Sequence, residues 1–169
     1  MAWLTPDEHQ QQVEAARDLV LRRLDRSAAP RAALAALLER KGTPPGVAQE
    51  VLDRLEETGV VDDTAYAELL ARTRFAEKGA ARRAIADELR RKGLGEQDVA
   101  SALGQIGADD ELAAATAIAA KKLAATAGLD PVVRRRRTLA TLGRKGYSME
   151  VCAHALERAL AQEDADALS

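Results

Sequence analysis

The sequence predicts an all-α protein made of three tandem copies of a three-helix unit. Alanine, the best helix former, accounts for 37 of the 169 residues, and no alternating run of β-branched residues suggests a strand. A Leu-x-x-Lys-Gly motif ends at Gly42, Gly93 and Gly146, with spacings of 51 and 53 residues. Because one copy is too small to bury its apolar face alone, we expect the three to stack into an elongated, curved helical array.

The first copy covers residues 1–60 and includes an N-terminal extension. Thr5, Pro6 and Glu8 have the order of a capping box, which places the start of the first helix there. Prolines then begin the second and third helices, and glycines follow their last turns. The expected helices are residues 6–26, 30–41 and 44–58. The third carries inward residues at helical spacing: Val47, Val51, Leu52 and Leu55.

The second copy covers residues 61–107. An aspartate, Asp62 or Asp63, caps its first helix, and glycines again end the helices. The expected helices are residues 62–78, 81–92 and 95–106. The residues expected to face inward are Tyr66, Leu69, Leu70, Thr73, Ile85, Leu89, Val99, Leu103 and Ile106.

The third copy covers residues 108–162, and residues 163–169 are expected to form a disordered acidic tail. Asp109, Asp130 and Ser148 stand at the predicted helix starts. The expected helices are residues 109–127, 131–142 and 149–162. The predicted packing stripes are Val132, Leu139 and Leu142 on the middle helix and Val151, Ala155, Leu156 and Ala159 on the last.

Equivalent positions around the glycine of each motif carry mostly apolar residues. The position eight residues before it holds Leu34, Ile85 and Thr138. The position six residues after it holds Ala48, Val99 and Cys152, and the position ten after it holds Leu52, Leu103 and Leu156. These spacings predict that each helix after the motif folds back over the helix before it.

The net charge of −2 hides a strong division of charge along the chain. Between Arg72 and Tyr147 there are 16 basic and 9 acidic residues, a net of +7, whereas the rest carries 9 and 18, a net of −9. This division favours a polyanionic partner, either nucleic acid or the acidic surface of a protein assembly. The predicted contact residues are Arg72, Lys78, Arg82, Arg83, Arg90, Arg91, Lys92, Lys121, Lys122, Arg134, Arg135, Arg136, Arg137, Arg144 and Lys145.

Four consecutive arginines, Arg134 to Arg137, are harder to explain as solvation alone. Successive helical residues turn by about 100°, so at least one of the four lies near the packing face and must run its stem along apolar surface. We interpret this tetrad as a contact surface, although any single arginine elsewhere is equally well explained by solubility. Arg74, on the apolar side of its helix, predicts a buried ion pair or a cap on a neighbouring helix.

Composition and motifs argue against several classes of function. Only four aromatic residues are present, too few for a module that stacks successive bases on rings. Cys152 is predicted to be a small buried hydrophobe and His154 a surface residue, and one thiol with two imidazoles cannot complete a usual zinc site. Carboxylate pairs occur at helix starts and ends, where caps and the helix dipole explain the acids at starts.

No phosphate loop, dinucleotide fingerprint or nucleophile elbow is present, so we predict a non-enzymatic protein without cofactor or metal. No secretory signal or apolar run of membrane-spanning length is seen. We therefore expect a cytoplasmic protein that is a monomer and does not bind membranes.

Several segments together resemble the bacterial regulatory protein family RecX. They are the three Lys-Gly helix ends, Gly59-Val60-Val61-Asp62-Asp63-Thr64-Ala65-Tyr66-Ala67, Ile85-Ala86-Asp87-Glu88-Leu89-Arg90-Arg91-Lys92-Gly93-Leu94, Lys121-Lys122 and Gly143-Arg144-Lys145-Gly146-Tyr147-Ser148. The resemblance covers about Ala16 to Leu160, and the Asp-Asp-x-x-Tyr-Ala and Glu-Leu-x-x-Lys-Gly elements are its more specific parts. Pro30 and Ala33 depart from it, since the family usually has Ser and Glu there.

The resemblance implies a non-enzymatic modulator of the RecA recombinase, built of three tandem three-helix repeats. Family members bind RecA filaments on DNA, lodge in the helical groove, block filament extension, and lower strand exchange and ATP hydrolysis. On this hypothesis the basic segments contact acidic filament surface or the single- or double-stranded DNA within it. The alternative is a helical-repeat protein that binds DNA directly, although no copy shows a basic recognition helix with Asn or Gln placed for base reading.

Overall fold

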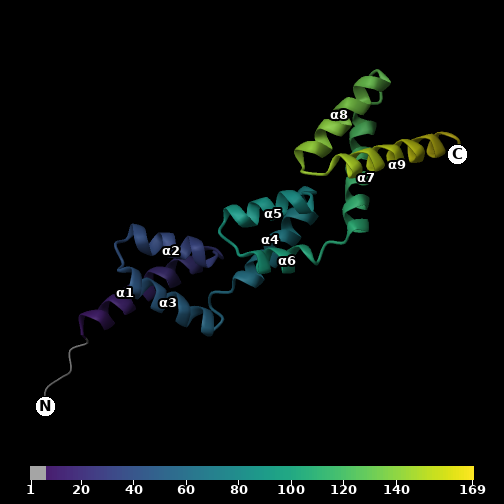
Figure 1. Cartoon of the computed structure of the whole chain (residues 1–169). Coiled ribbons are helices and arrows are strands. Elements are labelled where there is room, and N and C mark those ends of the chain that lie inside the picture. The colour runs from purple at the N-terminus through teal and green to yellow at the C-terminus, as the bar shows by residue number, and fades with distance from the viewer. Residues whose placement is uncertain (1–6) are drawn as a thin grey trace, which may run out of the picture. The chain divides into compact units, whose positions relative to one another are not determined.

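The structure, a computed structural model, describes residues 7–169 and is helical throughout that range (Figure 1). Its helices are α1 (Glu8–Arg26), α2 (Arg31–Arg40), α3 (Pro45–Glu57), α4 (Asp63–Lys78), α5 (Arg82–Arg91), α6 (Glu96–Leu103), α7 (Ala108–Ala125), α8 (Pro131–Arg144) and α9 (Met149–Ala167). The described residues contain no strand, so the all-α prediction is confirmed. None of these helices is long and apolar enough to cross a membrane.

The chain divides into two compact units. Among the described residues, unit 1 comprises residues 7–67 and 89–99, and unit 2 comprises residues 68–88 and 100–169. The division therefore passes through α4, α5 and α6, whereas α1 to α3 lie wholly in unit 1 and α7 to α9 wholly in unit 2.

Local sequence signals explain most helix ends. The predicted caps Asp62 and Ser148 accept from the amides of Ala65 and Val151, at 3.0 and 3.2 Å, and Asp130 caps α8 in the same way. The predicted capping residue Thr5 lies outside the described residues. The described part of α1 begins after Asp7, whose carboxylate accepts from the amide of Gln10 at 2.7 Å.

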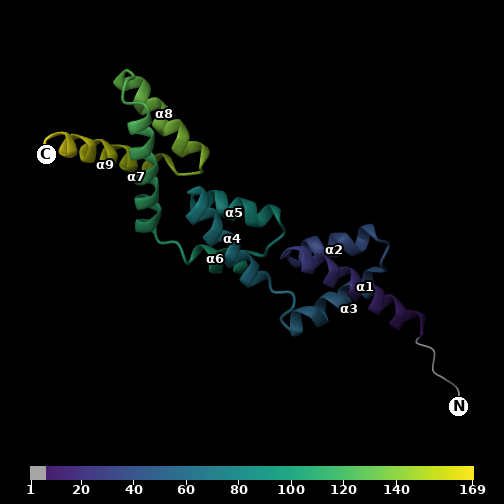
Figure 2. The same ribbon diagram turned by 180° about the vertical axis from the view of Figure 1, so that it is seen from behind.

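The core of unit 1 lies between α1, α2 and α3, which pack against one another in both views (Figures 1 and 2). Leu34 and Leu38 from α2 are fully buried, as is Leu52 from α3. The inward residues predicted for α3, Val47, Val51, Leu52 and Leu55, are all buried, which confirms its helical spacing. Burial of a leucine contributes about 1.5–3 kcal/mol, so these side chains supply much of the stability of this unit.

The core of unit 2 lies where α7 packs against α8 and α9 (Figure 2). Ala115, Ala119 and Leu123 are spaced four apart on α7 and have no exposed surface. They pack with Leu142 of α8 and Leu156 of α9. Small alanine side chains let these helix backbones approach closely, as the composition indicates.

Two predicted packing faces are wrong in part, although Leu142 of α8 is buried as predicted and Tyr66, Leu70 and Thr73 of α4 are partly buried. Leu69 is 53% exposed, and α4 instead buries Ala67 and Ala71 completely. On α8, Val132 is 71% exposed and Leu139 is also exposed, because Thr138 and Leu142 face the core. On α4 the fully buried positions are alanines, whereas on α8 they are Thr138 and Leu142, so side-chain size alone does not identify the buried stripe.

The C-terminal segment is not the disordered tail that its composition predicts. Helix α9 continues to Ala167, although every residue from 161 onward is exposed. Glu163 pairs with Arg134 of α8, at 2.9 Å between a carboxylate oxygen and Nη2. The helical continuation therefore places one acid, Glu163, opposite the basic helix α8.

The later two Lys-Gly turns each lie against the start of an earlier helix. A Cβ placed on Gly93 would lie 2.6 Å from Cβ of Ala32 in the first turn of α2, and one on Gly146 would lie 2.7 Å from Cβ of Ala84 in α5. Both glycines have positive φ, as Gly42 does, but Gly42 has open space around it. We call these close approaches the first joint, in unit 1, and the second joint, in unit 2.

Candidate functional site

Four lysines from three helical regions surround one hollow in unit 2. The hollow has a volume of about 540 Å³ and lies between the end of α4, the middle of α7 and the end of α8. Its lysines are Lys78, Lys121, Lys122 and Lys145, all predicted contact residues. We call it the lysine groove.

The helical packing of unit 2 places these lysines. Leu123 points from α7 into the core, so Lys121 and Lys122 lie on the flank of the helix. Lys145 follows the last turn of α8, and its backbone oxygen accepts from the amide of Ala81 at 3.0 Å. Its Nζ donates to the backbone oxygen of Lys78 at 2.6 Å, which ties two sides of the groove together.

Part of the lining of the groove is apolar, and we call this part the floor. Phe75 of α4 and Ile118 of α7 line it, together with Ala114 and Ala125. Gly79 has a φ of +59°, and a Cβ there would lie only 2.8 Å from Cδ1 of Ile118. Glycine suits this position because its φ is positive, and a side chain there would require Cδ1 of Ile118 to move.

The groove carries excess positive charge. Its lining holds four lysines and one acid, Glu77. Ammonium groups gathered around a low-dielectric floor attract anions more strongly than isolated surface charges do. The arrangement has the charge to attract a negatively charged group.

The arginine tetrad on α8 is divided between paired and unpaired members. Arg134 is 14% exposed, and its Nη2 donates to the backbone oxygen of Leu123 and to Glu163, each at 2.9 Å. It is therefore the member that lies near the packing face, as predicted. Arg135 pairs with Glu157 of α9. The side chains of Arg136 and Arg137 are exposed and form no ion pair within residues 7–169, while the backbone oxygen of Arg137 accepts from the Thr141 hydroxyl at 2.9 Å.

Other predicted contact residues take part in local ion pairs or hydrogen bonds. Arg72 donates to Gln105 at 2.9 Å, and Arg144 to the hydroxyl of Thr141 at 3.3 Å. Arg90 donates two hydrogen bonds to Glu96, at 2.7 and 3.1 Å, and these lower the pKa of that carboxyl. The side chains of Arg83, Arg91 and Lys92 are exposed.

The remaining predictions for single residues are confirmed. Arg74 forms a half-buried bidentate ion pair with Glu88, at 2.7 and 2.8 Å. Cys152 is a buried free thiol whose pKa is raised by burial, and His154 is exposed. Arg74 and Cys152 therefore support the fold rather than a partner surface.

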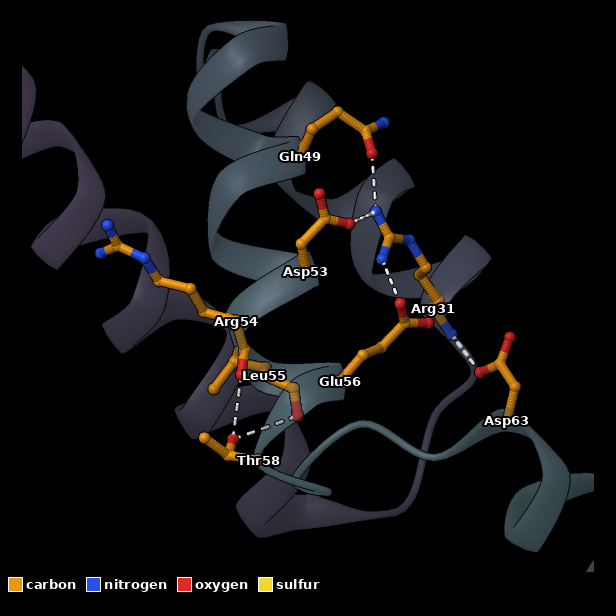
Figure 3. A network of polar contacts seen from close by, with 8 residues as sticks. All are labelled: Arg31, Gln49, Asp53, Arg54, Leu55, Glu56, Thr58 and Asp63. Atoms are coloured by element: carbon orange, nitrogen blue, oxygen red, sulfur yellow. Dashed lines mark hydrogen bonds and ion pairs between the residues drawn. The ribbon is translucent and has the colours of Figure 1, made fainter.

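Sequence reasoning did not find the polar network around Arg31 in unit 1 (Figure 3). From the first turn of α2, this guanidinium reaches α3 and binds Asp53 at 2.7 Å, Glu56 at 2.5 Å and Gln49 at 2.6 Å. Its backbone amide donates to Asp63 of α4 at 2.8 Å. Burial lowers the pKa of Arg31, but the bonds to Asp53 and Glu56 outweigh it and the pKa is raised.

The same contact recurs in unit 2 with a different acid. The backbone amide of Arg82, at the start of α5, donates to Glu111 of α7 at 3.1 Å. Arg82 stands 51 residues after Arg31, which is the spacing of the first two Lys-Gly motifs. The only signal for these contacts in the sequence is the repeat spacing itself, because Asp63 and Glu111 belong to different helix turns.

Unit 1 has a hollow of its own, with different chemistry. About 560 Å³ in volume, it lies between α1 and α3, and its lining is mainly apolar with Arg17 and Arg54 among the polar residues. Among residues 7–169, no three His, Cys, Asp or Glu side chains are grouped to hold a metal ion. The lysine groove is therefore the candidate site that combines the predicted residues.

The fold and the groove together define a class: a helical-repeat protein with a concentrated positive surface. Residues 62–103 match the family model for the second three-helix domain of RecX, and residues 109–156 match the model for the third. The regulatory protein RecX of Streptomyces coelicolor is 39% identical over 154 residues, covering 91% of this chain and 82% of that protein. The one from Thermobifida fusca is 42% identical over 133 residues, covering 79% and 72%.

Solved structures agree with the sequence relatives. The crystal structure of RecX from Lactobacillus salivarius superimposes with a TM-score of 0.81 over 88% of this chain and 97% of that one, at 16% identity. A second crystal structure of a regulatory protein RecX gives 0.74 over 89% and 78%, at 25% identity. This chain belongs to the RecX family, whose curated relatives are named as regulatory proteins, and the predicted helical-repeat fold is confirmed.

Proposed function

We propose that this chain regulates the RecA recombinase by binding RecA filaments in their helical groove. Bound there, it inhibits filament extension, ATP hydrolysis and strand exchange during DNA repair and recombination. Membership of a family of regulatory proteins carries this proposal, and the lysine groove supports it by offering a site for an anionic partner. The regulation is by binding, without a reaction of its own.

The proposed partner surface has two parts in unit 2. One is the lysine groove, and the other is the exposed pair Arg136 and Arg137 on α8. Arg134 and Arg135 are already neutralised by acids of α9, so they mainly hold α8 and α9 together. Arg90, Arg91 and Lys92 offer a further basic segment in unit 1.

The three-copy division at residues 1–60, 61–107 and 108–162 is part of the proposal. Three helical units in series contact more than one subunit of a filament, whereas a single unit contacts only one. A partner with repeating subunits then gains affinity from several weak contacts at once.

The test is strand exchange by RecA with the wild-type chain and two double variants. Arg136→Ala/Arg137→Ala removes two guanidinium groups that form no ion pair within the described residues, so folding should be unaffected. Inhibition of strand exchange should weaken by about tenfold, the loss expected for one or two charged contacts. The control is Arg22→Ala/Arg26→Ala, which removes two exposed arginines of α1. Equal inhibition by all three proteins at several salt concentrations would remove Arg136 and Arg137 from the mechanism.

Direct DNA binding is the second candidate, because four ammonium groups around one groove also suit a phosphate backbone. Titration of labelled DNA with and without RecA separates the two functions. Tight, salt-dependent binding to naked DNA favours the second candidate, and binding only to preformed filaments favours the first.

A further inference from the structure

The lysine groove combines two surfaces that different partners need. The charged part of its lining, which we call the rim, has four lysines against Glu77, while the apolar floor consists of Phe75, Ile118 and small residues. A partner that satisfied only the rim would leave the apolar floor covered by water. The chemistry of the floor therefore bears on which anion the groove holds.

A nucleic-acid backbone fits the rim but not the floor. Its phosphates and sugars are polar and gain nothing from contact with Ile118. Bases can stack on aromatic rings, but a strand that binds in this way uses several rings in succession, and Phe75 is the only ring in the lining. The floor thus disfavours a nucleic acid as its main occupant.

A peptide that carries both carboxylates and a bulky apolar side chain fits both surfaces. The volume of about 540 Å³ lies in the range of pockets that bury most of a small ligand. Lysine ammonium groups are compact charges on flexible stems, so they adapt to carboxylates at varied positions. Lys145 is the exception, because its bond to the Lys78 carbonyl holds it in place while leaving hydrogens free to donate.

We propose that the lysine groove binds an acidic peptide segment of a protein partner, with a bulky apolar side chain on the floor and its flanking carboxylates on the lysines. This inference rests on the proposed function, in which the partner is a recombinase filament, and it assigns the groove to the protein component rather than to the DNA.

The experiment measures fluorescence anisotropy of labelled probes with the full-length chain. The probes are an acidic peptide with two central leucines, the same peptide with serines in their place, and a single-stranded oligonucleotide of equal charge. Exchanging leucine for serine in the probe tests the floor without altering the protein. The protein variants are Lys121→Ala/Lys122→Ala and, as a control, Lys41→Ala, which removes the equivalent of Lys145 in the first Lys-Gly turn, outside the groove.

The leucine peptide should bind at least about tenfold more tightly than the serine peptide. Lys121→Ala/Lys122→Ala should weaken it by a similar factor, and Lys41→Ala should not. Equal affinity for both peptides, no dependence on the groove lysines, or an oligonucleotide that binds the groove as tightly as the leucine peptide would each overturn the inference.

Inhibition of strand exchange is measured in parallel, so that the two proposals fail separately. If the wild-type chain inhibits RecA but the probes do not discriminate, the proposed function stands and the peptide assignment is wrong. If the peptide binds as described but the chain has no effect on RecA, the groove assignment stands and the recombinase is not the partner.

Discussion

The two joints show how one repeat contact is stabilised in two ways. In each, a Lys-Gly turn approaches the first turn of an earlier helix so closely that only glycine fits. The second joint adds hydrogen bonds: the Ala81 amide donates to the Lys145 carbonyl, and the Tyr147 hydroxyl donates to the Gly79 carbonyl at 2.9 Å. The first joint has Pro30 and Leu94 at the equivalent positions, which lack an amide hydrogen and a hydroxyl.

The first joint has a different polar support. Arg31 connects the first turn of α2 to three residues of α3, whereas the guanidinium of its equivalent, Arg82, makes no ion pair within the described chain (Figure 3). The buried Nε of Arg82 has no hydrogen-bond partner. Close backbone packing is therefore the shared feature, and the polar contacts around it differ from copy to copy.

The strongest test of this comparison replaces the glycine of the second joint. Gly146→Ala should lower the free energy of unfolding by about 3 kcal/mol. About 1 kcal/mol of this loss comes from placing a side chain on a left-handed backbone, and the rest comes from overpacking against Ala84. Gly42→Ala, where space is open, should lose only the backbone part, about 1 kcal/mol. Urea unfolding followed by circular dichroism measures both, and equal losses would mean that close packing at the joint is unimportant.

A smaller effect is expected from the tyrosine hydroxyl. Tyr147→Phe should cost about 1 kcal/mol, because the Gly79 carbonyl loses its donor. Burial, with smaller contributions from Glu111 and Cys152, raises the pKa of Tyr147 to about 12. The contribution of the Tyr147 hydroxyl to the free energy of unfolding is therefore complete below pH 10 and decreases between pH 10 and 12. The free energy of unfolding of Tyr147→Phe should not show this decrease.

Arg31, beside the first joint, and its equivalent Arg82, beside the second, should contribute differently to stability. Arg31→Ala should cost about 1 kcal/mol, since its partners are partly exposed and screened by solvent, and the cost should shrink at high salt. Arg82→Ala loses only contacts of its stem, so its smaller cost should not depend on salt. Thermal unfolding at low and high salt distinguishes them; matching salt responses would contradict the assigned role of the network.

The smallest change in stability is expected at Asp63, whose carboxylate accepts a hydrogen bond from the backbone amide of Arg31. Burial raises the pKa of Asp63 despite the hydrogen bond from that amide, so the carboxylate is less stable in the folded chain than in water. Asp63→Asn keeps an acceptor oxygen and removes the buried charge, so stability at pH 7 should change by less than about 0.5 kcal/mol. A large loss in urea unfolding would show that the charge itself is needed there.

Helix ends could be predicted well because their signals are local. Asp62, Asp130 and Ser148 cap the helices that the sequence assigns to them. The buried face of α4 could not, since its fully buried positions are alanines, which also occur elsewhere on the helix. That of α8 could not, because its core pair, Thr138 and Leu142, is no more apolar than the exposed Val132 and Leu139. On α4, Leu69 is exposed while two alanines are buried.

The candidate site could be predicted only in part. Each lysine of the groove was identified from the charge of its segment, but their grouping depends on how α4, α7 and α8 pack. The pairing of Arg134 with Glu163 could not be predicted either, because composition alone indicates a disordered tail and not a helix at residues 163–169. Long-range packing decides which charges are neutralised.

The contacts of Arg134 have a practical consequence for anyone who shortens this protein. A truncation before Glu163 looks harmless in the sequence, yet it would leave Arg134, whose side chain is 14% exposed, without its counter-ion. Expression clones should therefore keep the chain at least through Ala167, and an affinity tag is better attached beyond Ser169 than in place of the last turns of α9.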